Sequence, residues 1–462
     1  VATGPVDFPD GITGVALTAT GNVTAGIGTF TTSIVVGSAV TANSDGIIVG
    51  GAVTATSFAG DGSSLTGVAS TDNINTSTPA SFVDINATGI VTAAQFVPTT
   101  GHLGNSNIII NGAMRVAQRG TSSTTSGAYT IDRMRQEFGG TDEAPTYAQV
   151  DVASGTTPYT LGFRKALKVT NGNQTGGAGA ADYIQIDYRF EAQDIANSGW
   201  NYTSSSSNLT LSFWIKSSVA QDTQVVLRTQ DGTSQSFQFK TGTLSADTWT
   251  KVTKTIPGHA NLQFDNDANH GLNLFWFPYI GTDYVNDSNT LDGWMASSGT
   301  TYGRTDTTTW YTTNDATYEL TGIQLEVGSV ATPFQFRSYA EELRLCQRYY
   351  KLIANNNGGT ATESFALGCC NDAAALHTIF DFEPEMRTTP TADVTTGTNY
   401  FSIIETNSGQ YSSTAPTSVS SRSSPRHFEL LWPIDGSTGT AGAAGFIYTA
   451  DNSAWCAFTA EF

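Results

Sequence analysis

Residues 184–190 read Ile-Gln-Ile-Asp-Tyr-Arg-Phe, with a large apolar side chain at every second position and polar side chains between them. Successive side chains of a β-strand point to opposite faces, so this alternation predicts a strand with one buried and one polar face. Residues 209–215, Leu-Thr-Leu-Ser-Phe-Trp-Ile, repeat the pattern. Residues 225–227 and 274–277 are continuous apolar runs, as expected of strands covered on both faces. The sequence therefore predicts an all-β fold, with about eight such strands in a two-sheet jelly-roll sandwich over residues 105–339.

The bulk composition agrees with this assignment. Gly accounts for 47 of 462 residues and only 13% of the residues are charged, which fits an all-β or fibrous protein better than a helical enzyme. The formal net charge is −19. An acidic chain of this kind is a poor partner for nucleic acid, because phosphate neutralisation needs clustered Lys and Arg. No apolar run approaches the ~20 residues of a membrane span, so no membrane partner is expected.

The first 104 residues differ in composition from the rest. No Lys or Arg occurs before Arg115, and Gly-Ala-Val-Thr-Ala-Thr-Ser-Phe at 51–58 is matched by Gly-Ile-Val-Thr-Ala-Ala-Gln-Phe at 89–96. One copy of this segment has too little apolar surface to offset the ~1–2 kcal/mol per residue of backbone ordering. Two outcomes are open: the segment is disordered, or several copies wind together into a repetitive β shaft over residues 1–104. We favour the shaft, because disordered segments are richer in charge and Pro than in Val and Phe.

A short helix is predicted after the sandwich. Ser338-Tyr-Ala-Glu341 is a capping box, and the apolar spacing that follows predicts a helix from roughly Tyr339 to Ile353, with residues 340–353 linking two domains. Cys346 falls on the apolar stripe of this helix and is expected to pack rather than react.

Strands return after the helix and predict a C-terminal β tip domain over residues 354–462. The expected strands are residues 365–367, 377–382, 400–405, 428–432 and 446–448. The four cysteines, Cys346, Cys369, Cys370 and Cys456, show neither a CxxC pair nor Cys/His zinc spacing. We expect free thiols, and therefore assembly in a reducing cytosol.

Several stretches carry a family resemblance. Thr321-Gly-Ile-Gln-Leu-Glu-Val-Gly328, Pro333-Phe-Gln-Phe-Arg337 and the run at 342–350 resemble tail-fibre and receptor-binding proteins of tailed bacteriophages, especially phages of marine cyanobacteria. The phrases at 211–217 and 247–252 are similar to carbohydrate-binding modules of jelly-roll type. The resemblance implies a structural virion protein: a homotrimeric tail fibre, assembled in the host cytoplasm, that joins other tail or virion proteins through its N-terminal side and adheres to host cell-surface polysaccharide.

Aromatic and polar side chains suited to sugars gather between residues 272 and 318. Sugars present C–H faces to aromatic rings and hydroxyls to polar groups. The candidate glycan surface consists of Tyr279, Tyr284, Trp294, Tyr302, Trp310, Tyr311, Asp283 and Arg304. The alternative is that these aromatics fill the ends of the sandwich or a seam between subunits, and that the tip domain holds the receptor site. Trp276 lies within an apolar run and is expected in the core.

Catalytic signatures are missing from the sequence. It has no GxSxG, HExxH or P-loop motif. Residues 265–269 have the Asp-x-Asp-x-Asn spacing that opens calcium loops, but the Gly comes one place late and no closing Glu follows. We expect no metal, no cofactor and no enzymatic activity. Two alternatives remain open: a head or baseplate decoration fibre without a receptor role, and a polysaccharide depolymerase that uses two carboxylates brought together by folding.

Overall fold

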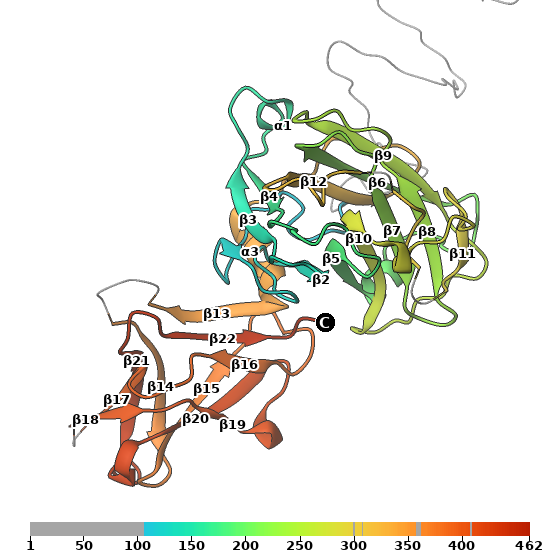
Figure 1. Cartoon of the computed structure of the whole chain (residues 1–462). Coiled ribbons are helices and arrows are strands. Elements are labelled where there is room, and N and C mark those ends of the chain that lie inside the picture. The colour runs from blue at the N-terminus through green and yellow to red at the C-terminus, as the bar shows by residue number, and fades with distance from the viewer. Residues whose placement is uncertain (1–105, 299–300, 307, 357–361, 407–408) are drawn as a thin grey trace, which may run out of the picture. The chain divides into compact units, whose positions relative to one another are not determined.

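The computed structural model describes residues 106–298, 301–306, 308–356, 362–406 and 409–462. These residues are mostly β and form several antiparallel sheets (Figure 1). The described residues all belong to one compact unit of the chain. The predicted shaft over residues 1–104 lies outside them.

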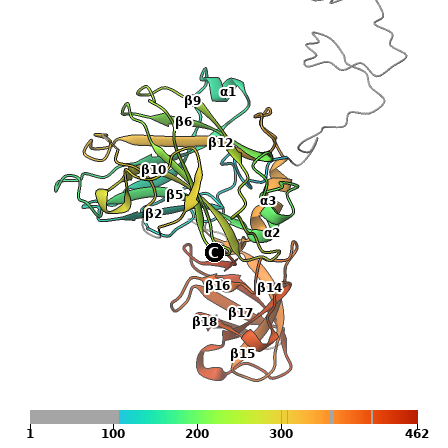
Figure 2. The same ribbon diagram turned by 90° about the vertical axis from the view of Figure 1, so that its right-hand side faces the viewer.

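The central block is a sandwich of two six-stranded antiparallel sheets. Figure 2 shows β6, β9 and β12 in one layer above β10, β5 and β2 in the other. The first sheet runs in the order β1 (Ser122–Ser123), β3 (Thr146–Asp151), β4 (Lys165–Thr170), β12 (Thr317–Val327), β6 (Asn208–Ser217) and β9 (Thr250–Pro257). The second runs β11 (Trp294–Ala296), β8 (Gln235–Lys240), β7 (Gln224–Thr229), β10 (His270–Ile280), β5 (Tyr183–Glu191) and β2 (Met134–Gly139).

The sandwich has more strands than the alternating segments predict, because short edge strands such as β1 and β11 carry no clear pattern. Three short helical segments interrupt them: α1 (Thr157–Thr160), α2 (Ala192–Ala196) and the 3-10 turn η1 (Thr282–Tyr284).

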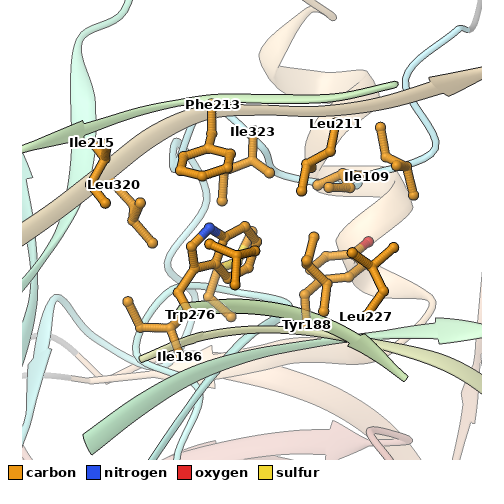
Figure 3. Close-up of a cluster of buried hydrophobic side chains, with 14 of the residues drawn as sticks. Ile109, Ile186, Tyr188, Leu211, Phe213, Ile215, Leu227, Trp276, Leu320 and Ile323 are labelled. Atoms are coloured by element: carbon orange, nitrogen blue, oxygen red, sulfur yellow. The ribbon is translucent and has the colours of Figure 1, made fainter. Parts of the chain in front are cut away.

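Apolar side chains from both sheets meet in one core (Figure 3). Trp276 of β10 is fully buried, as the sequence predicts, and its ring lies edge-on to Phe213 of β6 with the ring centres 5.8 Å apart. Ile186 and Tyr188 of β5 point into the same core. The polar residues between them therefore lie on the opposite, outer face of the second sheet.

The predicted helix is shorter than expected. α3 spans Tyr339–Gln347, and the residues from Tyr350 onward form a strand instead. The predicted cap is present: the Ser338 hydroxyl accepts a hydrogen bond from the Glu341 N–H at 3.2 Å. Cys346 is fully buried, whereas Tyr339 is exposed. The apolar stripe thus packs only from its second turn onward.

The C-terminal module contains two further antiparallel sheets around their own core. One has the order β13 (Tyr350–Asn355), β22 (Trp455–Thr459) and β16 (Thr391–Val394). The other has the order β18 (Gly409–Ser413), β17 (Phe401–Glu405), β21 (Ala444–Thr449), β14 (Ser364–Cys370), β15 (Ala375–Asp381), β20 (His427–Pro433) and β19 (Thr417–Ser418). Phe458 of β22 packs on Phe380 and Phe428 of the larger sheet, with ring centres 5.0 and 5.1 Å apart. The five strands predicted here all form.

A buried ion pair joins the central block to the residues that follow β22 in the C-terminal module. Arg133 is 1% exposed and pairs with Glu461, and its guanidinium lies 3.5 Å from the ring centre of Tyr349. Arg119 pairs with the same carboxylate at 3.2 Å. Among the described residues, no helix is both long and apolar enough to cross a membrane.

Candidate functional site

The outer face of the second sheet has an apolar end and a charged end. Phe275 and Phe277 of β10 point outward because their neighbours Leu274 and Trp276 point into the core. They form a second, smaller apolar cluster with Val226 of β7. Another part of the same chain shields this outward-facing apolar cluster from solvent.

The described residues of the segment, 281–298 and 301–306, cover this outer cluster and are held by polar contacts to the sheet. The Asn289 side-chain N–H donates to Gln238 Oε1 at 3.2 Å, and the Gln224 side-chain N–H donates to the Arg304 carbonyl at 2.8 Å. Lys240 Nζ lies 2.7 Å from Asp306 Oδ1. These contacts anchor Asn289, Arg304 and Asp306 on β7 and β8.

Two tyrosines of this segment border a hollow of about 170 Å³. Tyr284 meets Tyr183 of β5 edge-on with ring centres 5.3 Å apart, and Tyr302 lies 5.6 Å from Phe277. The hollow is lined by Glu137, Tyr183, Gln185, Phe277, Ile280, Tyr284 and Tyr302. We call it the tyrosine hollow.

The polar wall of the tyrosine hollow comes from β2 and β5. Glu137 and Gln185 are directly paired across these strands, and the Gln185 side-chain N–H donates to Glu137 Oε2 at 3.1 Å. Arg135 donates to the other oxygen, Oε1, at 3.2 Å. Burial and the Glu137 carboxylate raise the pKa of Tyr183, so its hydroxyl stays protonated at neutral pH and can donate. The hollow therefore offers donors and acceptors beside aromatic surface.

Alternating charges continue along β5 away from the hollow. Arg189 Nε donates to Asp187 Oδ2 at 2.7 Å, and the Asn273 side-chain N–H donates to Asp187 Oδ1 at 2.9 Å. Arg135 approaches the same carboxylate at 3.7 Å. Burial raises the pKa of Asp187 in spite of these partners. Asp187 itself is fully buried, so it is the side chains of Arg135 and Arg189, 17% and 20% exposed, that extend the polar surface beyond the hollow.

The structure brings together only part of the predicted glycan surface. Tyr284 and Tyr302 line the hollow. Arg304 does not line it, but its Nε donates to the Asn289 carbonyl at 2.7 Å and so holds the residues next to Tyr302 in place. Asp283 is exposed on η1, next to Tyr284.

The other predicted aromatics lie elsewhere. Trp310 and Tyr311 are fully buried and contribute no surface, because Trp310 Nε1 donates to the Thr317 carbonyl inside the sandwich and Tyr311 stacks on Tyr279 at 4.2 Å. Trp294 is half-buried against the core, where its Nε1 donates to the Pro257 carbonyl at 2.6 Å.

Five residues of the tyrosine hollow were not predicted as site residues: Glu137, Tyr183, Gln185, Phe277 and Ile280. The alternation of β5 marks Gln185 as outward-facing, but the sequence does not show that β2 pairs with β5 or that Tyr284 and Tyr302 lie over them. Among the described residues, no group of three or more His, Cys, Asp or Glu side chains is arranged to hold a metal ion.

Comparison with known proteins identifies no sequence family. No known family matches the chain, and no curated protein matches it. Solved structures give distant matches: a CBM4 carbohydrate-binding module (14% identity, TM-score 0.22, 47% of this chain and 98% of that one) and the N-terminal cellulose-binding domain of Cellulomonas fimi β-1,4-glucanase C (13%, 0.23, 46% and 97%). The enzymatically active domain of tailspike protein 4 from bacteriophage CBA120 also matches (8%, 0.25), and this chain spans 22% of its length. These are distant likenesses of fold to carbohydrate-binding modules and to a phage tailspike domain.

Proposed function

We propose that this chain is a fibre protein of a tailed-phage virion that adheres to host-surface glycans through the tyrosine hollow. The observation that carries the glycan part is the juxtaposition of Tyr284 and Tyr302 with the Glu137–Gln185 pair in one hollow. Tyrosine rings offer apolar faces to the C–H surface of a sugar, and the carboxylate, amide and hydroxyl groups match its hydroxyls.

The size of the hollow bears on the ligand. Its volume of about 170 Å³ is below the ~300–1,000 Å³ typical of pockets for drug-sized molecules. We therefore expect one sugar unit to occupy it while the rest of the glycan lies along the partly exposed side chains of Arg135 and Arg189. The proposed role is binding without catalysis.

The virion part of the proposal rests on the sequence. The ending at residues 321–337 resembles phage tail fibres, and the first 104 residues have too little apolar surface for a single copy to fold. The proposed assembly is a homotrimer with an N-terminal shaft. Three weak glycan sites on one fibre would reinforce one another through their high effective concentration.

Adsorption competition tests this proposal. Purified full-length chain is added to host cells before the phage that carries it, and the fraction of adsorbed phage is measured. The wild-type chain is expected to reduce adsorption. Tyr302→Ala should need about tenfold more protein for the same effect, since a lost aromatic contact of ~1.5 kcal/mol corresponds to about a factor of ten.

Two further variants separate binding from folding. Tyr302→Phe keeps the ring and should block adsorption nearly as well as the wild type. Tyr159→Ala removes a half-buried tyrosine on α1 that does not line the hollow, and it should leave the effect unchanged. If the wild-type chain does not reduce adsorption at all, the decoration-fibre alternative holds. If Tyr302→Ala blocks adsorption as well as the wild type does, the tyrosine hollow is not the glycan-binding site.

A further inference from the structure

Large apolar side chains are exposed together after β12. Val330, Phe336 and Tyr339 are 73%, 45% and 50% exposed, and Leu161 at the end of α1 is 52% exposed. Phe336 lies against α1, since a Cβ added at Gly162 would be 3.1 Å from its ring. Leu161 and Phe336 line one hollow, and adjoining exposed apolar side chains in a soluble protein often mark a contact surface.

Phe336 belongs to a cluster of three phenylalanines. Its ring centre is 4.8 Å from that of Phe334 and 5.1 Å from that of the buried Phe163. Trp214 of β6 joins them in lining a hollow of about 370 Å³. We call Leu161, Trp214, Phe334 and Phe336 the Phe336 patch.

The charge around this hollow favours contact between copies of the same chain. Among its described lining residues none is acidic, and Lys251 is charged. The whole chain carries a net charge of −19, so two copies repel each other over most of their surface. A surface without carboxylates is where such copies can approach with the least repulsion.

The path of the chain places the Phe336 patch beside the proposed shaft. The Asn107 N–H donates to Gln335 Oε1 at 2.9 Å, and the Ser106 hydroxyl donates to the same oxygen at 3.4 Å. Gln335 lies between Phe334 and Phe336 in the sequence. The chain therefore enters the central block at the patch, and copies wound together just before residue 106 would bring their patches close to one another.

We infer that the Phe336 patch is the surface through which the central blocks of neighbouring copies of this chain contact one another. The inference rests on the proposed fibre assembly, because the shaft is what brings the entry points of several copies together. It does not depend on glycan binding at the tyrosine hollow, which lies on the other sheet of the sandwich.

Photo-crosslinking in the full-length chain tests the inference. Phe336→p-benzoyl-phenylalanine keeps an aromatic ring in place and reacts with whatever lies against it on illumination. We expect a product of two-chain mass on a denaturing gel, with the cross-link mapped by mass spectrometry to the central block of a second copy. Leu367→p-benzoyl-phenylalanine is the matched control, since Leu367 is 79% exposed on β14 of the C-terminal module, and it should give no such product.

Other outcomes overturn the inference in distinguishable ways. A cross-link from position 336 only to residues before 106, or only within one chain, means that the patch is covered by another segment. Analytical ultracentrifugation of the same samples separates the remaining cases. An oligomer without a cross-link between central blocks contradicts the patch alone, whereas a monomer contradicts the proposed fibre assembly as well.

Discussion

His270, the first residue of β10, stands among arginine side chains. Its Nε2 is buried without a hydrogen-bond partner among the described residues. Burial, reinforced by Arg189, Arg133 and Arg387, lowers the pKa of His270 to about 3. The imidazole of His270 is therefore neutral in the folded chain. It lies between the central block and the C-terminal module, where protonating it beside the arginines would raise the free energy of the folded state.

The low pKa of His270 predicts a loss of stability in acid. The ordinary histidine pKa is about 6.5, so between that value and about 3 the unfolded chain binds more protons than the folded chain. The stability that the neutral ring supplies is full above about pH 6.5 and is lost as the pH falls toward about 3. His270→Asn should therefore reduce the decrease in free energy of unfolding between about pH 7.5 and about pH 5.

Urea unfolding at the two pH values measures this decrease. His427→Asn is the matched control, because His427 is exposed and its substitution should leave the decrease as in the wild type. Equal decreases for the wild type and His270→Asn would show that His270 does not carry the acid sensitivity.

At the scale of single elements, β12 depends on one glycine. The pairing of β12 with β6 shifts register between Thr321 and Gln324, and Gly322 within the shift has a φ of +64°. A Cβ added at Gly322 would lie 2.6 Å from the Phe163 ring. Gly is needed here both for the backbone conformation and for the close approach of the ring.

Gly322→Ala should therefore destabilise the fold by ~2–4 kcal/mol, from backbone strain together with displacement of a buried ring. The midpoint of denaturant unfolding measures the change. Gly120→Ala is the control, because Gly120 also has a positive φ but open space around it, so its effect should be smaller. If Gly322→Ala lowers the free energy of unfolding no more than Gly120→Ala does, the close contact with the Phe163 ring is not a cause of the destabilisation.

Most of the individual strands can be predicted from the sequence, whereas the end of the helix cannot. Alternation along β5 and β6, and the apolar run around Trp276, identify strands and their buried faces correctly, because the period of a strand is a local property. The end of α3 at Gln347 could not be read in this way: the residues after it retain apolar side chains, and pairing with β22 turns them into β13.

The candidate site was predicted less well, for a physical reason. The aromatics that follow the apolar run around Trp276, from residue 279 to residue 318, look alike in sequence, yet Tyr302 lines the hollow while Trp310 is buried in the core. The difference is set by contacts to distant residues, such as Gln224 holding the Arg304 carbonyl. Such contacts depend on the closed sheet and leave no local pattern.

At the scale of the whole described unit, the Arg133–Glu461 pair ties the C-terminal module to the central block. Both side chains are nearly fully buried. Glu461→Ala would leave the Arg133 charge without its carboxylate, and breaking a buried pair from one side typically costs ~3–5 kcal/mol. We expect the free energy of unfolding to fall by about 3 kcal/mol, measured by chemical denaturation with probes in both modules.

An exposed ion pair provides the comparison for Glu461. Arg426 and Glu385 are 73% and 46% exposed in their pair, so Glu385→Ala should change the free energy of unfolding by less than ~1 kcal/mol. Similar small effects for both substitutions would mean that the junction does not hold the two modules together.

The proposed role of the whole molecule depends on a sugar entering the tyrosine hollow. The most direct test is the dissociation constant, by isothermal titration calorimetry, of the full-length chain for purified host-surface polysaccharide. We predict measurable binding that is retained by Tyr159→Ala and weakened about tenfold or more by Tyr302→Ala. Equal affinity for all three proteins, or no binding by the wild type, would contradict the account.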